Sequence, residues 1–136
     1  MNNIHIFETV TTMLSSAAVA ENGAGVIYEG RKTTYRELDD LSRRAAAGLA
    51  SLGVGLGDRV AFWLPNTPAY LVLYFACVRL GAVAVAVNTR FRAGEVEYVL
   101  GRTGAKALIM WPGFRGIDFP GILEEVDRAA LARLEV

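Results

Sequence analysis

The sequence is poor in the side chains that build metal centres and catalytic triads, because its 136 residues include one cysteine and one histidine. A single cysteine, Cys77, cannot form an internal disulfide or a metal cluster, which favours a reducing, cytoplasmic setting. Cys77 lies in the apolar stretch LYFACVRL, so we expect a buried and inert thiol. His5 lies near the N-terminus and is expected to be solvated. No catalytic residues and no metal ligands are therefore predicted.

An excess of charge of either sign is also lacking, since 14 basic and 14 acidic side chains cancel. A nucleic-acid-binding protein normally carries a basic excess, so nucleic acid is not an expected partner. The acidic residues of LDD (38–40) and LEEV (123–126) are neighbours in sequence. Neighbouring positions do not face one another across a helix, so we expect solvated surfaces and no acid–base pair.

Long apolar runs are scarce, and only residues 69–87 approach the length of a membrane span. Arg79 lies inside this run and Gly81 comes two residues after Arg79, which favours a buried helix ending at Gly81 and then a strand. A membrane-associated protein that uses this run is the rival interpretation. Residues 10–20 lack a basic residue ahead of them, so a signal peptide is not expected.

Glycine is plentiful, yet the spacing of GVGLG (53–57) is not that of a dinucleotide fingerprint. The fingerprint needs G-x-G-x-x-G after a strand and before a helix, whereas here an apolar strand pattern follows the glycines. We expect Gly53 to end a helix and Gly55 and Gly57 to form a tight turn before Asp58.

The remaining pattern predicts an α/β fold: an open, mainly parallel sheet with flanking helices, preceded by a helix and a short β-hairpin. Residues 1–55 would hold the helix, hairpin and second helix, and residues 56–136 a βαβαβ unit. The first helix carries Phe7, Val10, Leu14 and Ala17 at helical spacing. The expected later elements are a hairpin within 24–37, a helix from a Thr34–Glu37 capping box to Gly53, a strand at 59–64, a helix at 68–80, a strand at 82–87, a helix at 94–104, a strand at 105–111, a mobile aromatic segment at 112–121 and a last helix around 122–134.

Three details of this pattern can be checked directly. The helix before Gly53 should bury a stripe of leucine and alanine and leave Asp39 with the solvated charges; the stripe is Leu38, Leu41, Ala45, Leu49 and Leu52. Residues 82–87 have the continuous apolar character of a strand buried on both faces. Asn66 or Thr67 should cap the helix that begins at Pro68.

Ligands of open α/β sheets bind beyond the carboxyl ends of the strands, where LPNT (64–67) and VNTRFR (87–92) are expected. The second segment offers Arg90 and Arg92, whose planar, permanently charged guanidinium groups suit phosphate. Alternatively, both arginines lie in a solvated loop and pair with Glu95 or Glu97.

Five short stretches in this order resemble the N-terminal part of the AMP-binding, adenylate-forming superfamily, and most of all its fatty-acyl and aryl CoA ligases. They are TYREL, GLASLGVGLGDRVAFWLPN, RLGAV, NTRF and GEVEYVL. The resemblance runs from about Phe7 to near the C-terminus. VNTRF favours acyl-CoA ligases over peptide-synthetase adenylation domains. Ala86 departs from the pattern, since many relatives have proline there.

The resemblance implies an ATP- and Mg²⁺-dependent ligase that converts a fatty or aryl carboxylate to an acyl-adenylate and then to a CoA thioester. The family's phosphate loop ending in Lys, its magnesium-associated Glu, its ribose-binding Asp and its mobile-domain Lys are all absent from these 136 residues. The resemblance therefore implies an inactive N-terminal fragment that binds no cofactor tightly and self-associates through uncovered apolar faces. Arg90, and to a lesser degree Arg92, would contact CoA phosphates in the full-length enzyme. A stand-alone α/β module that binds a nucleotide or CoA without catalysis is the alternative.

Overall fold

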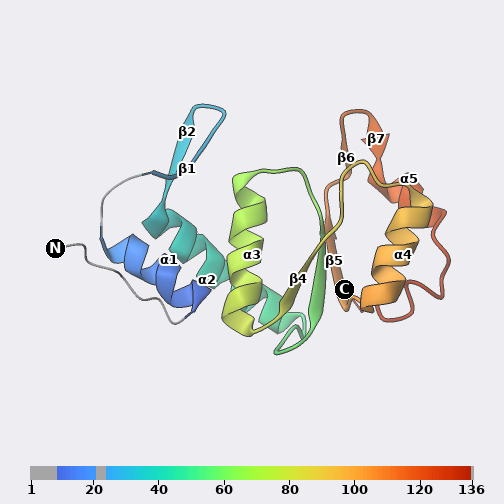
Figure 1. Cartoon of the computed structure of the whole chain (residues 1–136), viewed down its shortest axis with the longest axis horizontal. Helices are drawn as coiled ribbons and strands as arrows, with labels where there is room; N and C mark the ends of the chain where they lie inside the picture. Colours follow the sequence, from blue (N-terminus) through green and yellow to red (C-terminus); the bar gives the residue numbers. More distant parts are fainter. Residues whose placement is uncertain (1–8, 21–23, 136) are drawn as a thin grey trace.

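The computed structural model describes residues 9–20 and 24–135. His5 and Phe7, which the sequence analysis singled out, lie outside these residues. Figure 1 shows the order of the elements along the chain. They are α1 (Val10–Val19), β1 (Ala24–Tyr28), β2 (Arg31–Thr34), α2 (Tyr35–Ser51), β3 (Arg59–Trp63), α3 (Pro68–Leu80), β4 (Val83–Ala86), α4 (Ala93–Thr103), β5 (Ala107–Met110), β6 (Gly113–Phe114), β7 (Ile117–Asp118) and α5 (Phe119–Glu124).

The centre of the fold is a three-stranded parallel sheet with the strand order β4-β3-β5. Val60 of β3 stands opposite Ala84 of β4 on one side and Ala107 of β5 on the other. Helices lie on both sides of this sheet: α1, α2 and α3 on one side, α4 and α5 on the other (Figure 1). The predicted α/β class with a parallel sheet and flanking helices is confirmed.

Burial on the two faces of β3 builds two separate clusters, because successive side chains of a strand point to opposite faces. Val60 and Phe62 pack with α2 and α3, whereas Ala61 and Trp63 pack with α4 and α5. All four side chains are fully buried. Residues of α2 share the first cluster with β3; the division of the chain near residue 55 stays a prediction.

The local signals at the start of α2 and at the ends of α2 and α3 are confirmed. Thr34 and Glu37 form the capping box at the start of α2. Gly53 and Gly81 follow α2 and α3 at positive φ, +84° and +66°, which glycine adopts without steric cost. Thr67 is the N-cap residue of α3, but its hydroxyl makes no capping bond and has no partner among the described residues. The predicted position of the cap at Thr67 is therefore confirmed, but the expected hydrogen bond from its side chain is absent.

The prediction that residues 82–87 are buried on both faces is also wrong. β4 is an edge strand that pairs only with β3 among the described strands. Val83 is 49% exposed and Ala86 is exposed as well. The apolar run gave no signal of this position, because strand order in a sheet depends on distant parts of the chain.

The predicted apolar stripe of α2 holds at Leu38 and Leu49 but fails at Leu41 and Leu52, which are exposed. Asp39 was expected on the solvated face and is instead buried. That prediction is wrong because the partner of Asp39 is Arg79, 40 residues further along the chain.

Asp39 connects three helices through its carboxylate. It accepts hydrogen bonds from Ser15 of α1 (3.2 Å), from Arg43 (2.9 Å) and from Arg79 of α3. Arg79 also donates to the hydroxyl of the buried Ser42 (3.0 Å). Burial by itself raises the pKa of Asp39, but the hydrogen bond from Arg43 and the charges of Arg79 and Arg43 outweigh it, so the net pKa lies below its ordinary value.

The C-terminal part differs from the expected long helix. Residues 112–121, predicted as a mobile aromatic segment, contain the β6–β7 hairpin, and Phe119 at the start of α5 stacks on Trp63 with ring centroids 4.4 Å apart. α5 ends at Glu124, so the predicted helix around 122–134 is wrong. Asp127 interrupts it, because its carboxylate accepts from the Ala129 N–H (2.7 Å), a local turn that competes with a helix.

Replacing Asp39 with alanine should remove about 3 kcal/mol from the free energy of unfolding, since it leaves Arg79 nearly buried without a counter-charge. Urea denaturation at pH 7 measures the difference. Asp40→Ala, at an exposed neighbouring carboxylate, is the matched control and should cost no more than about 0.5 kcal/mol.

The same pair predicts a pH dependence. The pKa of folded Asp39 lies below the unfolded value of about 3.9, so its contribution is complete above that value and is lost as the pH falls through the folded pKa. The stability difference between the wild-type chain and Asp39→Ala should therefore shrink below about pH 4. A difference that stays constant down to pH 2 would contradict this.

Candidate functional site

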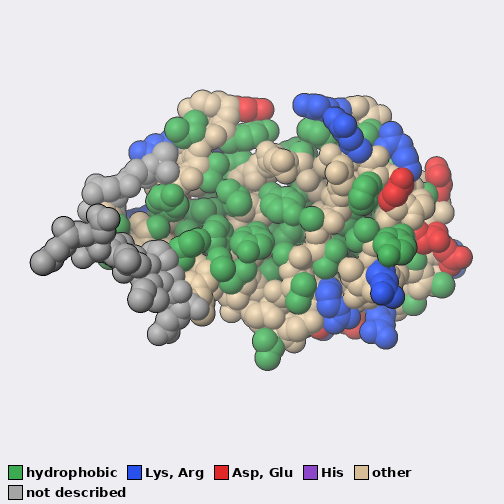
Figure 2. Space-filling model, in the orientation of Figure 1, with side chains coloured by type: hydrophobic (Ala, Val, Ile, Leu, Met, Phe, Trp, Pro, Cys, Tyr) green, Lys and Arg blue, Asp and Glu red, His purple; other side chains and the backbone are tan. Residues whose placement is uncertain are grey.

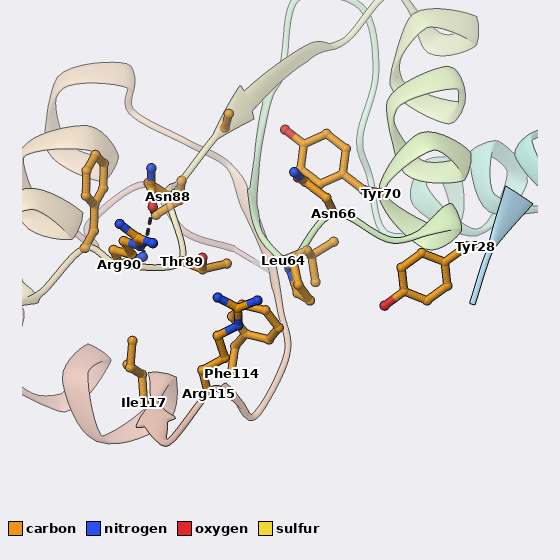
Figure 3. Close-up of a pocket in the computed structure, with 14 residues that line it drawn as sticks. Tyr28, Leu64, Asn66, Tyr70, Asn88, Thr89, Arg90, Phe114, Arg115 and Ile117 are labelled. Atoms are coloured by element: carbon orange, nitrogen blue, oxygen red, sulfur yellow. Dashed lines mark hydrogen bonds between the residues drawn. The ribbon is translucent and has the colours of Figure 1, made fainter. Parts of the chain in front are cut away.

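A cavity of about 780 Å³ lies at the carboxyl ends of β3 and β4. Its walls come from the tip of the β1–β2 hairpin, the segments after β3 and β4, the start of α3 and the β6–β7 hairpin (Figure 3). This is the edge at which open α/β sheets bind ligands. The lining residues are Tyr28, Leu64, Pro65, Asn66, Tyr70, Ala86, Val87, Asn88, Thr89, Arg90, Phe91, Phe114, Arg115 and Ile117.

Arg90 lines this cavity from a loop that the protein holds in place. The indole N–H of Trp63 donates to the backbone carbonyl of Asn88 (3.1 Å), and the Asn88 side-chain oxygen accepts from the Arg90 backbone N–H (2.9 Å). The guanidinium of Arg90 is solvent-exposed and makes no hydrogen bond or ion pair with a described residue. It is therefore available to an anion.

Arg92 does not line the cavity. Its guanidinium turns back on its own loop and donates to the carbonyl oxygens of Arg90 (3.1 Å) and Phe91 (3.5 Å). Its backbone N–H donates to Glu95 (3.0 Å) at the start of α4, while Glu97 accepts from the Asp127 N–H (3.0 Å). The structure thus separates the two arginines that the sequence had grouped.

Arg115 is a lining residue that the sequence analysis missed. It lies in the turn of the β6–β7 hairpin, where Arg115 and Gly116 both have positive φ (51° and 80°). Its guanidinium lies 5.2 Å from the ring centroid of Phe114, and Figure 3 shows it pointing toward the space between Thr89 and Leu64. The signal was present in the sequence, since the segment after β5 leaves the sheet at the same edge as the segments after β3 and β4.

The cavity is cationic, because the part of the chain that the structure describes lines it with two guanidinium groups and no carboxylate. Tyr28 and Tyr70 add aromatic rings and hydroxyl groups to its wall. Partial burial, and to a smaller extent the negative charge of the neighbouring Glu29, raise the pKa of Tyr28. The phenol therefore stays protonated and can donate a hydrogen bond. Such a wall can hold a phosphate group beside a flat or apolar ligand portion.

The glycine-rich segment 53–57 serves structure and does not form a phosphate cradle. The N–H of Gly53 donates to Ala50, that of Gly55 to the Asp58 carboxylate and that of Gly57 to Gly81, so the protein uses all three. The hydrogen bond from the Gly55 backbone N–H, and next the hydrogen bond from the Lys106 side chain, lower the pKa of Asp58. The interpretation of these glycines as a helix end and a tight turn is confirmed.

Two further findings concern the described residues only. No group of three or more His, Cys, Asp or Glu side chains lies close enough there to hold a metal ion. None of the helices in residues 9–20 and 24–135 has the length and apolar character needed to cross a membrane. The run 69–87 is α3 followed by β4, as the sequence analysis favoured.

A parallel sheet between helices, with a cationic cavity at its carboxyl edge, is the arrangement of nucleotide-binding α/β proteins. The model of the AMP-binding enzyme family matches residues 14–135. YngI of Bacillus subtilis (strain 168) is 37% identical over 124 residues, which cover 89% of this chain and 23% of YngI. The long-chain-fatty-acid–CoA ligase FadD13 of Mycobacterium tuberculosis (strain ATCC 25618 / H37Rv) is 41% identical over 78 residues, which cover 57% of this chain and 16% of FadD13.

Solved structures agree with this result. The anthranilate CoA ligase AuaEII in complex with anthranoyl-AMP superposes with a TM-score of 0.81 and 25% identity, over 97% of this chain and 25% of that one. The chain belongs to the AMP-binding, adenylate-forming family, in the branch whose members include acyl-CoA synthetases and ligases. It spans a quarter or less of the length of these relatives.

Cys77 is fully buried in α3, and burial raises the pKa of its thiol to about 11. At pH 8.5 the folded thiol should therefore carry about a hundredfold less thiolate than an ordinary cysteine. A thiol-specific disulfide reagent should react slowly with the native chain and rapidly in 8 M urea (a denaturing control, about pH 8.5). Rapid reaction of the native chain would contradict the expected inert thiol.

Proposed function

We propose that this chain is the N-terminal part of an ATP-dependent acyl-CoA ligase. In the whole enzyme a carboxylate attacks the α-phosphate of ATP to give acyl-adenylate and pyrophosphate. The acyl carbon then passes to the CoA thiol sulfur, with AMP as the leaving group. The family match over residues 14–135 is the observation that carries the proposal.

The substrate class follows from the relatives. FadD13 is named for long-chain fatty acids and AuaEII for anthranilate, an aryl acid. We accordingly assign a fatty or aryl carboxylate to the whole enzyme. A single buried cysteine fits a reducing, cytoplasmic setting.

Within this part of the enzyme, the cavity at the carboxyl ends of β3 and β4 would hold an anionic portion of CoA. The fit is chemical: among the described residues the Arg90 guanidinium has no partner, Arg115 faces the same cavity and no carboxylate lines it. CoA supplies the acyl-accepting thiol when it is bound. Arg90 and Arg115 would bind phosphate oxygens, and the bonds that join Trp63, Asn88 and Arg90 would fix the position of that loop.

The chain alone should not form acyl-adenylate, because the family's phosphate loop and its acidic and lysine partners are absent from the 136 residues. Incubation with ATP, Mg²⁺ and a panel of fatty and aryl acids should release no pyrophosphate above a heat-denatured control. Acid-dependent release by protein free of host ligase would overturn the proposal. An in-frame continuation of the coding sequence with a Gly/Ser/Thr-rich loop ending in Lys would support it.

Binding of CoA to the cavity can be measured on this chain by NMR titration. We expect a dissociation constant on the order of 1 mM, since the rest of the binding site is missing. Arg90→Ala and Arg115→Ala should each weaken binding about tenfold, because each removes a charge-assisted hydrogen bond of about 1.5 kcal/mol. Arg92→Ala is the matched control with a smaller expected loss, since its guanidinium is held by loop carbonyls.

The cavity itself favours one alternative function, a stand-alone module that binds CoA or a nucleotide without catalysis. Calorimetric titration separates the two proposals. Saturation at micromolar CoA or ATP would support the stand-alone module, whereas weak binding supports the partial ligase. If the wild-type chain, Arg90→Ala and Arg115→Ala bind CoA with equal affinity, CoA binds outside this cavity.

A further inference from the structure

The β6–β7 hairpin turns through a residue type that its backbone conformation disfavours. Two residues, Arg115 and Gly116, join the antiparallel pair Phe114–Ile117, and both have positive φ (51° and 80°). Positive φ at both central positions is the mark of a type I′ turn, whose first position favours asparagine, aspartate or glycine. An arginine adopts this conformation at a cost in folding free energy.

The side chain of Arg115 offsets little of that cost. The residue is exposed, and its guanidinium makes no hydrogen bond or ion pair with a described residue. It lies over the ring of Phe114, 5.2 Å from the centroid, a contact that is weak at an exposed site. A disfavoured backbone conformation that the packing does not explain points to a role in ligand binding.

The base of this hairpin is fixed to the core. Phe114 and Ile117 pack against the cluster that contains the buried Trp63. A Cβ at Gly113 would lie 2.5 Å from the Ile117 carbonyl oxygen, so the two strands approach more closely than any other residue at this position would allow. The hairpin therefore holds the backbone of Arg115 at a defined place on the cavity wall.

Two guanidinium groups reach the cavity from different elements. Arg90 comes from the segment after β4 and Arg115 from the β6–β7 turn, and Figure 3 shows Thr89 between them. Figure 2 shows a notch between the tips of the β1–β2 and β6–β7 hairpins, with an acidic side chain at the first tip and basic side chains at the second. Two cations that face one space repel each other, and an anion with several negative charges relieves that repulsion.

We propose that Arg115 is the specificity-determining residue of this cavity, presented by the β6–β7 turn at a cost in stability, and that it selects ligands with a phosphate or diphosphate group. The inference rests on the proposed function, in which that ligand is CoA, and adds that stability and selectivity oppose each other at this position. A planar guanidinium donates two parallel hydrogen bonds to a phosphoryl group, which an asparagine amide does not. Arg115→Asn should therefore give a more stable chain that binds anions more weakly.

The β1–β2 hairpin offers a matched control, because its turn has the same geometry. Glu29 and Gly30 join the pair Tyr28–Arg31, with φ of 48° and 75°. Glu29→Asn therefore makes the same improvement at the first position of a type I′ turn. Glu29 does not line the cavity, and the loss of its negative charge removes no attraction for an anion.

Urea denaturation of the full chain tests the stability part of the proposal. Arg115→Asn and Glu29→Asn should each raise the midpoint by about 0.4 M, because asparagine adopts positive φ more readily than arginine or glutamate. Arg115→Lys keeps the charge without improving the turn, so its midpoint should stay at the wild-type value. A midpoint of Arg115→Asn at or below that of the wild-type chain would overturn the proposal.

NMR titration with CoA and with inorganic pyrophosphate tests the selection. Arg115→Asn should bind both ligands about tenfold more weakly than the wild-type chain, Arg115→Lys about threefold more weakly, and Glu29→Asn no more weakly. Where one ligand alone binds, the order of the variants with that ligand decides the proposal, and binding of pyrophosphate alone would still overturn the assignment of CoA. Equal affinities of the wild-type chain and Arg115→Asn, or no binding of either ligand, would overturn the selection by Arg115.

Discussion

The fold depends on one constraint, the complete burial of β3. Four consecutive side chains from Val60 to Trp63 have no exposed surface, so both faces and both edges of this strand must be covered. β4 and β5 cover the edges, the helices around α3 cover one face, and α4 with α5 cover the other. The position of the cavity follows, because it lies where β3 and β4 end and their connecting segments diverge.

Elements with strong local signals could be predicted from the sequence. The Thr34–Glu37 capping box, Gly81 at the end of α3 and the apolar pattern of β3 each depend on residues close together in the chain. Arg90 could be predicted as a cavity residue for a related reason. It follows a strand, and the carboxyl ends of parallel strands meet at one edge whatever the details of packing.

What the sequence could not reveal depends on contacts between distant residues. From the sequence, Asp39 is indistinguishable from a surface carboxylate, because its partner Arg79 lies on another helix. The exposure of β4 depends on strand order, which the apolar run does not encode. Arg92 points away from the cavity because its guanidinium donates to the carbonyl oxygen of Arg90 in the same loop. The amino-acid composition of the segment does not predict this hydrogen bond.

Trp63 joins the interior of the protein to the rim of the cavity. One face of its ring stacks on Phe119, and its indole N–H donates to the carbonyl of Asn88 in the loop that carries Arg90. An occupant that displaced this loop would alter the polarity around a dry indole. In a variant that lacks the 40% exposed Trp111, a shift in tryptophan emission would therefore report such a displacement of the loop without any attached label.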